Sequence, residues 1–266
     1  MPSIATLVLL AALSWAVVIL WVRSSLMMDA MPGRATLGDA ASFAGMWLLM
    51  MAAMMVPALT PVVLLFRTMQ RRRATQGSPA VPTAAYVGGY LVVWALAGIG
   101  ADFVYSAAHA AGDHLRAGSG AVPYLGGGII GLAGLYQFSP LKHVCLARCR
   151  SPFHMILHGW HEGRLGALRM GASHGAYCLG CCWGIMAVLF VVGLMNLGWM
   201  AALSVLIAVE KLTPWGAAMS RLVGGLFIAL GVFMAVQPTL FPASGLQPAS
   251  TMPMTQMPHR QSGTMP

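Results

Sequence analysis

Residues 170–186 read MGASHGAYCLGCCWGIM, which places one histidine and three cysteines inside a continuous apolar run. Polar groups are costly in hydrocarbon unless they find a partner, so their presence in a membrane helix indicates a function. In a helix, His174, Cys178 and Cys181 follow one another at i, i+4 and i+7, which is one face. Cys182 continues an overlapping row from His174 and Cys178. The stretch therefore predicts a helix that gathers soft metal ligands on one side.

The composition around this stretch is that of an integral membrane protein. Of the 266 residues, 58% are hydrophobic and only 8% are charged, whereas soluble domains carry about 25% charged residues. The apolar runs are continuous and do not alternate with polar residues, which excludes a membrane β-barrel and predicts an all-α, polytopic helix bundle. The net charge of +9 fits cytoplasmic loops and lipid headgroups, so we expect membrane lipids and no nucleic acid as partners.

Seven apolar segments predict six or seven transmembrane helices, because the sixth is short for the roughly 20 residues that a span requires. The first segment is expected to be a retained helix, since it is longer than the apolar core of a signal peptide. The segments are Ile4–Val22, Phe43–Phe66, Ala84–Ala107, Val122–Phe138, Gly171–Met195, Leu197–Val209 and Ala217–Val236.

The distribution of basic residues predicts the orientation in the membrane. A cytoplasmic N-terminus puts most of the 15 Lys and Arg residues on the cytoplasmic side, as the positive-inside rule requires of a multi-pass protein of the bacterial inner membrane. We expect one transmembrane domain over residues 1–236, with an amphipathic cytoplasmic segment at 139–170. Residues 237–266 are rich in Pro, Thr and Met and predict a disordered tail, which is periplasmic if the chain has seven helices.

A second candidate ligand set lies in the segment GMWLLMMAAMMVPALTP, residues 45–61. Pro57 and Pro61 each remove an intrahelical hydrogen bond, which predicts a kink. Thioethers here would lead Cu(I) from outside toward the cysteines, while core packing explains methionine in a helix equally well. The methionines form two adjacent i+4 rows and are Met46, Met50, Met51, Met54 and Met55.

The cytoplasmic segment contains the related stretches SPLKHVCLARCR and SPFHMILHGWHE. Each begins with Ser-Pro, which predicts a Ser N-cap followed by Pro at the first helical position, and Gly163 closes the second helix. Cys145 and Cys149 are one turn apart on the first helix and are equally explained by metal transit and by packing. For His154, His158 and His161 on the second helix, a solvated interface is the favoured interpretation.

A charged pair ends the sixth segment, in the sequence AVEKLTPW. An ionisable group near a membrane indicates function by default, which makes Glu210 a candidate. An interfacial salt bridge between Glu210 and its neighbour Lys211 is the alternative, and the sequence favours neither.

Three stretches carry a resemblance to a known family: LYQFSPLKHVCLARCRSP, GALRMGASHGAYCLGCCWGIMAVLFVVGLMNLGWMA and EKLTPWG. They resemble a bacterial family of predicted metal-binding integral membrane proteins, a domain of unknown function that is often labelled copper chaperone. The Met-rich helix is similar to that family's second helix, and the resemblance covers most of Gly45–Gly231. It implies a polytopic helical protein with a role in handling a metal, namely copper.

The ligand chemistry favours Cu(I), because thiolate and thioether donors select it, and zinc is the second candidate. The leading hypothesis is a non-enzymatic protein, without catalytic residues, that delivers Cu(I) to a periplasmic or membrane recipient. No nucleotide-binding motif occurs in the sequence, which argues against an ATP-driven pump. The expected metal ligands are His174, Cys178, Cys181 and Cys182, with Met50, Met51, Met54 and Met55 as co-ligands and with Cys145 and Cys149 on the cytoplasmic side.

Two other function classes fit the same residues. The CxxC pair Cys178 and Cys181, with Cys145 and Cys149 as a second pair, is typical of a membrane thiol-disulfide oxidoreductase. A copper-dependent oxidase anchored by His174 is a variant of this enzymatic hypothesis, although thiolate-rich ligation favours holding Cu(I) over activating oxygen. The third class is a helix-bundle subunit whose cysteines only pack.

Overall fold

The computed structural model describes residue 9 and residues 12–20, 37–76, 81–115, 122–151, 161–193 and 196–237. All regular secondary structure within these ranges is helical, which confirms the all-α part of the predicted fold class. The second Ser-Pro helix with His154 and His158, and the tail after residue 237, lie outside the described residues. His161 is described and is exposed.

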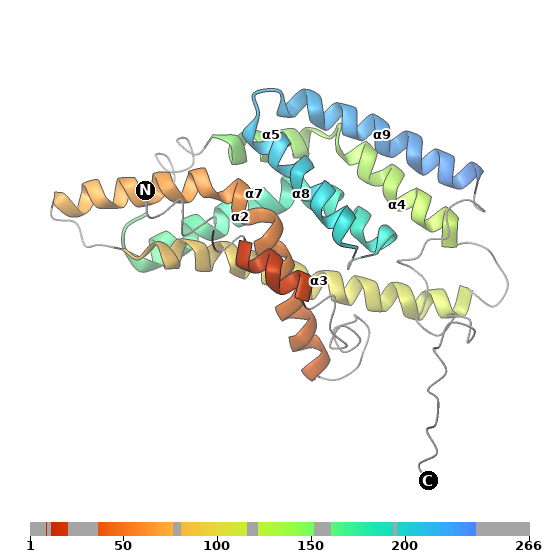
Figure 1. Ribbon diagram of the computed structural model, residues 1–266, viewed down its shortest axis with the longest axis horizontal. Coiled ribbons are helices and arrows are strands. Elements are labelled where there is room, and N and C mark those ends of the chain that lie inside the picture. Colours follow the sequence, from red (N-terminus) through yellow and green to blue (C-terminus); the bar gives the residue numbers. More distant parts are fainter. Residues whose placement is uncertain are drawn as a thin grey trace, which may run out of the picture.

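The helices follow the apolar segments closely but extend further at polar ends, notably in α2 and α7. Gly163 is the first residue of α7 and has a positive φ of 77°, while the helix it was expected to close lies outside the described residues. Besides a helical stretch at residues 12–20, the structure has α2 (Leu37–Thr75), α3 (Thr83–Leu115), α4 (Val122–Tyr136), α5 (Pro140–Arg150), α7 (Gly163–Val192), α8 (Leu197–Leu212) and α9 (Gly216–Val236) (Figure 1).

Within the described part of the chain, fewer helices can cross a membrane than the sequence predicted. Three are long and apolar enough, namely Thr83–Val104 of α3, all of α7 and all of α9, and the bent helix α2 makes a fourth if it counts as one span. The helices α4 and α8 have 15 and 16 residues. At 1.5 Å per residue they are about 23 Å long, short of the roughly 30 Å hydrocarbon core.

Helix α2 has the predicted kink. Its parts Phe43–Val56 and Ala58–Thr75 meet at 77°. Pro57 has no N–H, so the carbonyl of Ala53 one turn earlier loses its helical donor. The indole N–H of Trp15 donates to this carbonyl at 3.0 Å, which satisfies the group that the kink leaves free.

Glycines allow α3 and α7 to pack closely. A Cβ atom added at Gly171 of α7 would lie 1.8 Å from the carbonyl oxygen of Tyr86, and one at Gly89 of α3 would lie 2.0 Å from the carbonyl oxygen of Leu168. Small residues at such positions let helix backbones approach. The close packing brings the side chains of Tyr86 and Tyr90 on α3 against the histidine and cysteines of α7.

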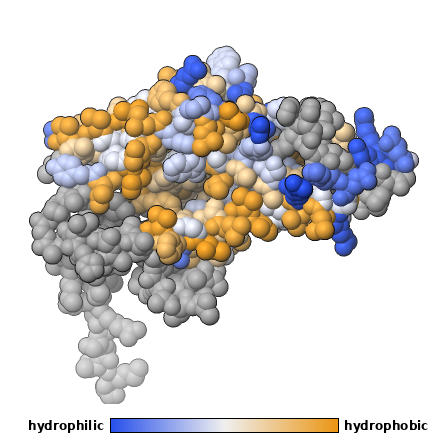
Figure 2. Space-filling view, turned by 180° about the vertical axis from the view of Figure 1, so that it is seen from behind, coloured by the Kyte–Doolittle hydropathy of each residue, from blue (hydrophilic) through white to orange (hydrophobic). Residues whose placement is uncertain are grey.

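Large apolar side chains cover much of the outside of the bundle. Phe103 on α3, Leu132 on α4 and Leu226 on α9 are between 65% and 74% exposed. Figure 2 shows patches of hydrophobic residues across one face, with the most hydrophilic residues at one end and along the top edge. This distribution is the one expected of a surface that faces lipid.

Candidate metal centre

Three helices bring four sulfur atoms together inside the bundle. The Sγ atom of Cys178 on α7 lies 4.0 Å from the Sδ atom of Met55 on α2, and the Sγ atom of Cys181 lies 3.8 Å from the Sγ atom of Cys149 on α5. All four side chains are buried and the cysteines are free thiols. We call Met55, Cys149, Cys178 and Cys181 the sulfur cluster.

Helix α5 is held so that Cys149 reaches the cluster. The helix starts as predicted, with Pro140 at its beginning and the Oγ atom of Ser139 accepting from the backbone N–H of Lys142 at 3.1 Å. A Cβ atom added at Gly180 of α7 would lie 2.7 Å from the sulfur of Cys145. The glycine therefore lets α5 approach α7.

The two cysteines of α5 have different surroundings. Cys149 joins the cysteines of α7, although the sequence suggested a separate cytoplasmic pair. Hydrogen bonding with Cys178 and Cys181 raises the pKa of the Cys149 thiol. Cys145 packs against Gly180, and burial raises the pKa of its thiol.

The other predicted ligands of α7 lie on the same helix face but have their own partners. The Nδ1 atom of His174 is 2.7 Å from the hydroxyl of Tyr86, which orients the imidazole. The thiol of Cys182 donates to the backbone carbonyl of Cys178 at 2.9 Å, a common way for a helical side chain to satisfy itself. The hydroxyl of Tyr90 is 3.0 Å from the sulfur of Cys178.

The methionine rows of α2 are all in the core. Met50, Met51 and Met54 are at most 2% exposed, and Met55 is 1% exposed. Met55 comes just before the kink of α2 and contacts Cys178. The structure thus brings one of the four predicted methionine ligands to a predicted cysteine ligand and places the other three in the surrounding core.

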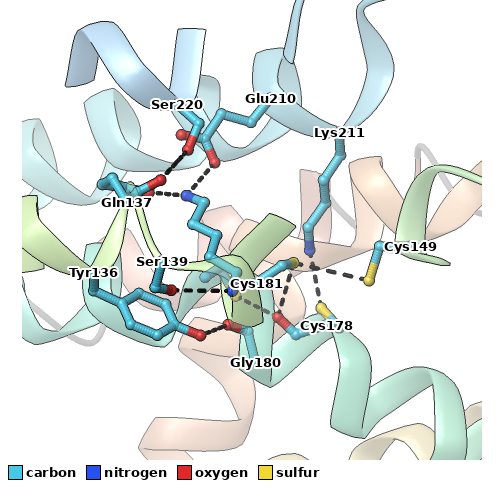
Figure 3. Close-up of polar contacts among 12 residues, drawn as sticks. Tyr136, Gln137, Ser139, Cys149, Cys178, Gly180, Cys181, Glu210, Lys211 and Ser220 are labelled. Carbon is cyan, nitrogen blue, oxygen red and sulfur yellow. Dashed lines mark hydrogen bonds and ion pairs between the residues drawn. The ribbon is translucent and has the colours of Figure 1, made fainter. Parts of the chain in front are cut away.

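A lysine that the sequence did not identify as part of the site points into the cluster. The Nζ atom of Lys211 on α8 lies 2.9 Å from the sulfur of Cys178 (Figure 3). It lies 3.7 Å from the sulfur of Met55. The alternative of a salt bridge between Lys211 and Glu210 is wrong, because Glu210 pairs instead with Lys142 at 2.7 Å. Adjacent residues of a helix point in different directions, which is why these two have different partners.

Glu210 belongs to a buried polar network beside the cluster. Lys142 of α5 donates to its carboxylate and to the side-chain oxygen of Gln137. The hydroxyl of Ser220 on α9 donates to the same side-chain oxygen at 3.2 Å. Among the described residues, one carboxylate oxygen of Glu210 and the side-chain nitrogen of Gln137 have no hydrogen-bond partner. The network connects the short helix α5 to α8 and α9.

Each of the two sulfur contacts has a length that a shared metal ion would allow. Two sulfur atoms that share an ion at about 2.3 Å each lie about 3.8 to 4.0 Å apart when the angle at the ion is between about 110° and 120°. Both contacts of the sulfur cluster have this separation, which neighbouring sulfur atoms in plain packing contact can also have. The described residues contain no group of three or more His, Cys, Asp and Glu placed to hold an ion, so a centre here depends on the thioether of Met55.

Comparison with known proteins adds a family. The family model PpoB2, described as copper chaperone, matches residues 44–234, which confirms the resemblance seen in the sequence. The matched region includes the whole sulfur cluster, His174 and Lys211. No curated protein and no solved structure matches the chain.

Proposed function

Because the chain belongs to the PpoB2 family of copper chaperones, we propose that it binds Cu(I) at the sulfur cluster and passes the ion to a recipient protein. The observation that carries this proposal is the convergence of Met55, Cys149, Cys178 and Cys181 from three helices. Buried cysteines can be plain packing residues. An ammonium group on the sulfurs of Cys178 and Met55 is not explained by packing, because it requires a negative charge nearby.

The proposed location is the bacterial inner membrane, crossed several times with a cytoplasmic N-terminus. The apolar outer surface and the three helices of spanning length among the described residues support a multi-pass membrane protein, and the cytoplasmic N-terminus rests on the positive-inside rule. The finer proposal of six or seven crossings rests on the apolar segments of the sequence. It requires α4 and α8 to cross a locally thin or distorted part of the bilayer, since both are short.

The proposed chemistry is ligand exchange without a change in oxidation state. Each copper–sulfur bond that breaks is replaced by one to a thiol or thioether of the recipient. Thiolate and thioether donors favour Cu(I) over harder ions. The methionines of α2 would give Cu(I) a path toward the cluster, and His174 and Cys182, next to it on α7, are the remaining candidate ligands.

The test is the copper content of the detergent-purified protein after anaerobic loading with Cu(I). We expect about one copper per chain in the wild type and a large loss in Cys178→Ser and Cys181→Ser. Cys145→Ser is the matched control, because it removes a buried thiol that is outside the sulfur cluster, and it should keep its copper. Negligible copper in the wild type, or equal copper in all variants, would refute the proposed site.

A second candidate function is thiol redox chemistry, favoured by the 3.8 Å separation of the Cys149 and Cys181 sulfurs. The S–S bond of a disulfide is about 2.05 Å long, so a small movement would allow these two to join. Peptide mapping of the metal-free protein distinguishes the two functions. A reversible Cys149–Cys181 disulfide in a protein that binds no copper would replace the chaperone proposal with an oxidoreductase.

A further inference from the structure

We propose that Lys211 determines the metal selectivity of the sulfur cluster, because its positive charge balances a monovalent ion held by two thiolates better than a divalent one. The inference rests on the proposed function, since it assigns a role in copper binding to a residue that neither the sequence nor the family match identified. It concerns which ion the cluster prefers, and its test is separable from the test of copper binding itself.

The positive charge of Lys211 lies at the sulfur cluster. The Nζ atom of Lys211 contacts the sulfurs of Cys178 and Met55. Among the described residues no carboxylate forms an ion pair with it, whereas Lys142, the other lysine nearby, is paired with Glu210. The charge of Lys142 is therefore already balanced, and the charge of Lys211 is directed at the sulfurs.

A simpler role for Lys211 would be to stabilise the end of α8. Lys211 is in the last turn of α8, where a cation interacts favourably with the helix dipole and can bond the last carbonyls. Its ammonium group does not take that position. It extends toward Cys178 of the cluster, as Figure 3 shows.

A buried metal site favours a net charge near zero, because an uncompensated buried charge is costly. Two thiolates, the ammonium group of Lys211 and Cu(I) add up to zero. The same set with Zn²⁺ leaves one positive charge. Neutrality with zinc requires all three cysteines of the cluster to ionise, and the fourth ligand is then the thioether of Met55, which is a poor donor for zinc compared with thiolate, imidazole or carboxylate.

Removal of the charge should reverse this preference. In Lys211→Met, two thiolates with Cu(I) keep one negative charge, and two thiolates with Zn²⁺ are neutral. Loss of a group that supports the ligands of a metal typically costs about 10- to 100-fold in affinity. We expect Lys211→Met to weaken Cu(I) binding by about 10- to 100-fold and to leave zinc affinity unchanged or higher.

The experiment compares two affinities in wild type, Lys211→Met, Lys211→Gln and Lys211→Arg. Cu(I) affinity is measured anaerobically by competition with a chromophoric Cu(I) chelator, and zinc affinity by competition with a zinc indicator. Lys211→Arg keeps the charge and should keep most of the preference for Cu(I). Lys211→Gln is a second neutral variant in case Lys211→Met does not fold, as judged by elution from a sizing column.

The ratio of Cu(I) affinity to zinc affinity shows whether Lys211 determines selectivity. A structural role for Lys211 would weaken the binding of both metals together. If the wild type binds copper and the neutral variants keep its ratio of Cu(I) to zinc affinity, this inference alone is overturned. A higher preference for Cu(I) in the neutral variants overturns it as well, and shows that the ammonium group competes with the metal. A wild type that binds no copper overturns the proposed function first.

Discussion

The buried ion pair between Lys142 and Glu210 offers a sharp test of how the cluster is held in place. The two side chains are 0% and 2% exposed and their charged atoms are 2.7 Å apart. The change Glu210→Gln keeps the size of the side chain and removes its charge. It leaves the ammonium group of Lys142 buried with the oxygen of Gln137 and an amide oxygen as acceptors.

The expected loss of stability depends on whether one or both partners of the buried ion pair are replaced. Removal of one partner leaves an uncompensated buried charge and costs about 3–5 kcal/mol, whereas replacement of both partners by apolar groups of similar volume is often neutral or stabilising. Because two neutral acceptors remain near Lys142, we expect Glu210→Gln to fall near the lower value, about 3 kcal/mol. The double change Lys142→Met with Glu210→Met should cost less than either single change.

The assay is the free energy of unfolding in detergent, with the wild type, Lys142→Met, Glu210→Met and the double variant compared as a double-mutant cycle. A strong coupling between the two sites is the expected result. Additive losses, with the double variant as unstable as the sum of the single ones, would show that the pair contributes no mutual stabilisation. The pairing of α5 with α8 would then need another explanation.

Three further perturbations have defined outcomes. Gly171→Ala should separate α3 from α7 and lower thermal stability in a melting assay, whereas Gly88→Ala, with nothing within 4 Å of its added Cβ, should not. Trp15→Phe removes the donor to the carbonyl freed at the α2 kink and should cost about 1–3 kcal/mol in the same assay, and a loss of zero would show that the kink needs no such donor. Removal of copper with a chelator should make Cys149 and Cys181 open to disulfide formation by a mild thiol oxidant, while Cu(I) loading protects them; equal disulfide yields in peptide maps of both samples would contradict this.

The fold could be predicted from the sequence because hydrophobicity determines most of it. Continuous apolar runs require helices in a membrane, since only a helix satisfies its backbone within one segment. The kink at Pro57 was also predictable, because proline lacks the N–H whatever surrounds it. The number of spans was not, because an apolar run of 16 residues fits a crossing helix and a short internal one equally well.

The site could be predicted only where its residues share one helix. His174, Cys178, Cys181 and Cys182 fall on one face of α7 by periodicity alone. The contact of Cys149 with Cys181 depends on how α5 folds back onto α7, which no local spacing encodes. The role of Lys211 depends on the rotation of α8 about its axis, and its acidic neighbour suggested a different partner.

The same rotation of α8 links the polar network to the sulfur cluster. Glu210 and Lys211 are consecutive, so the ion pair that Glu210 forms with Lys142 also determines where Lys211 points. Lys142 lies on α5, the helix that carries Cys149, so one ion pair orients both the cation and one of the thiols. A side chain that is fixed by its supporting contacts holds its ligand geometry better than one on a free loop. The buried pair is therefore best understood as the support that orients the cluster, and this accounts for a costly pair of charges in a mostly apolar bundle.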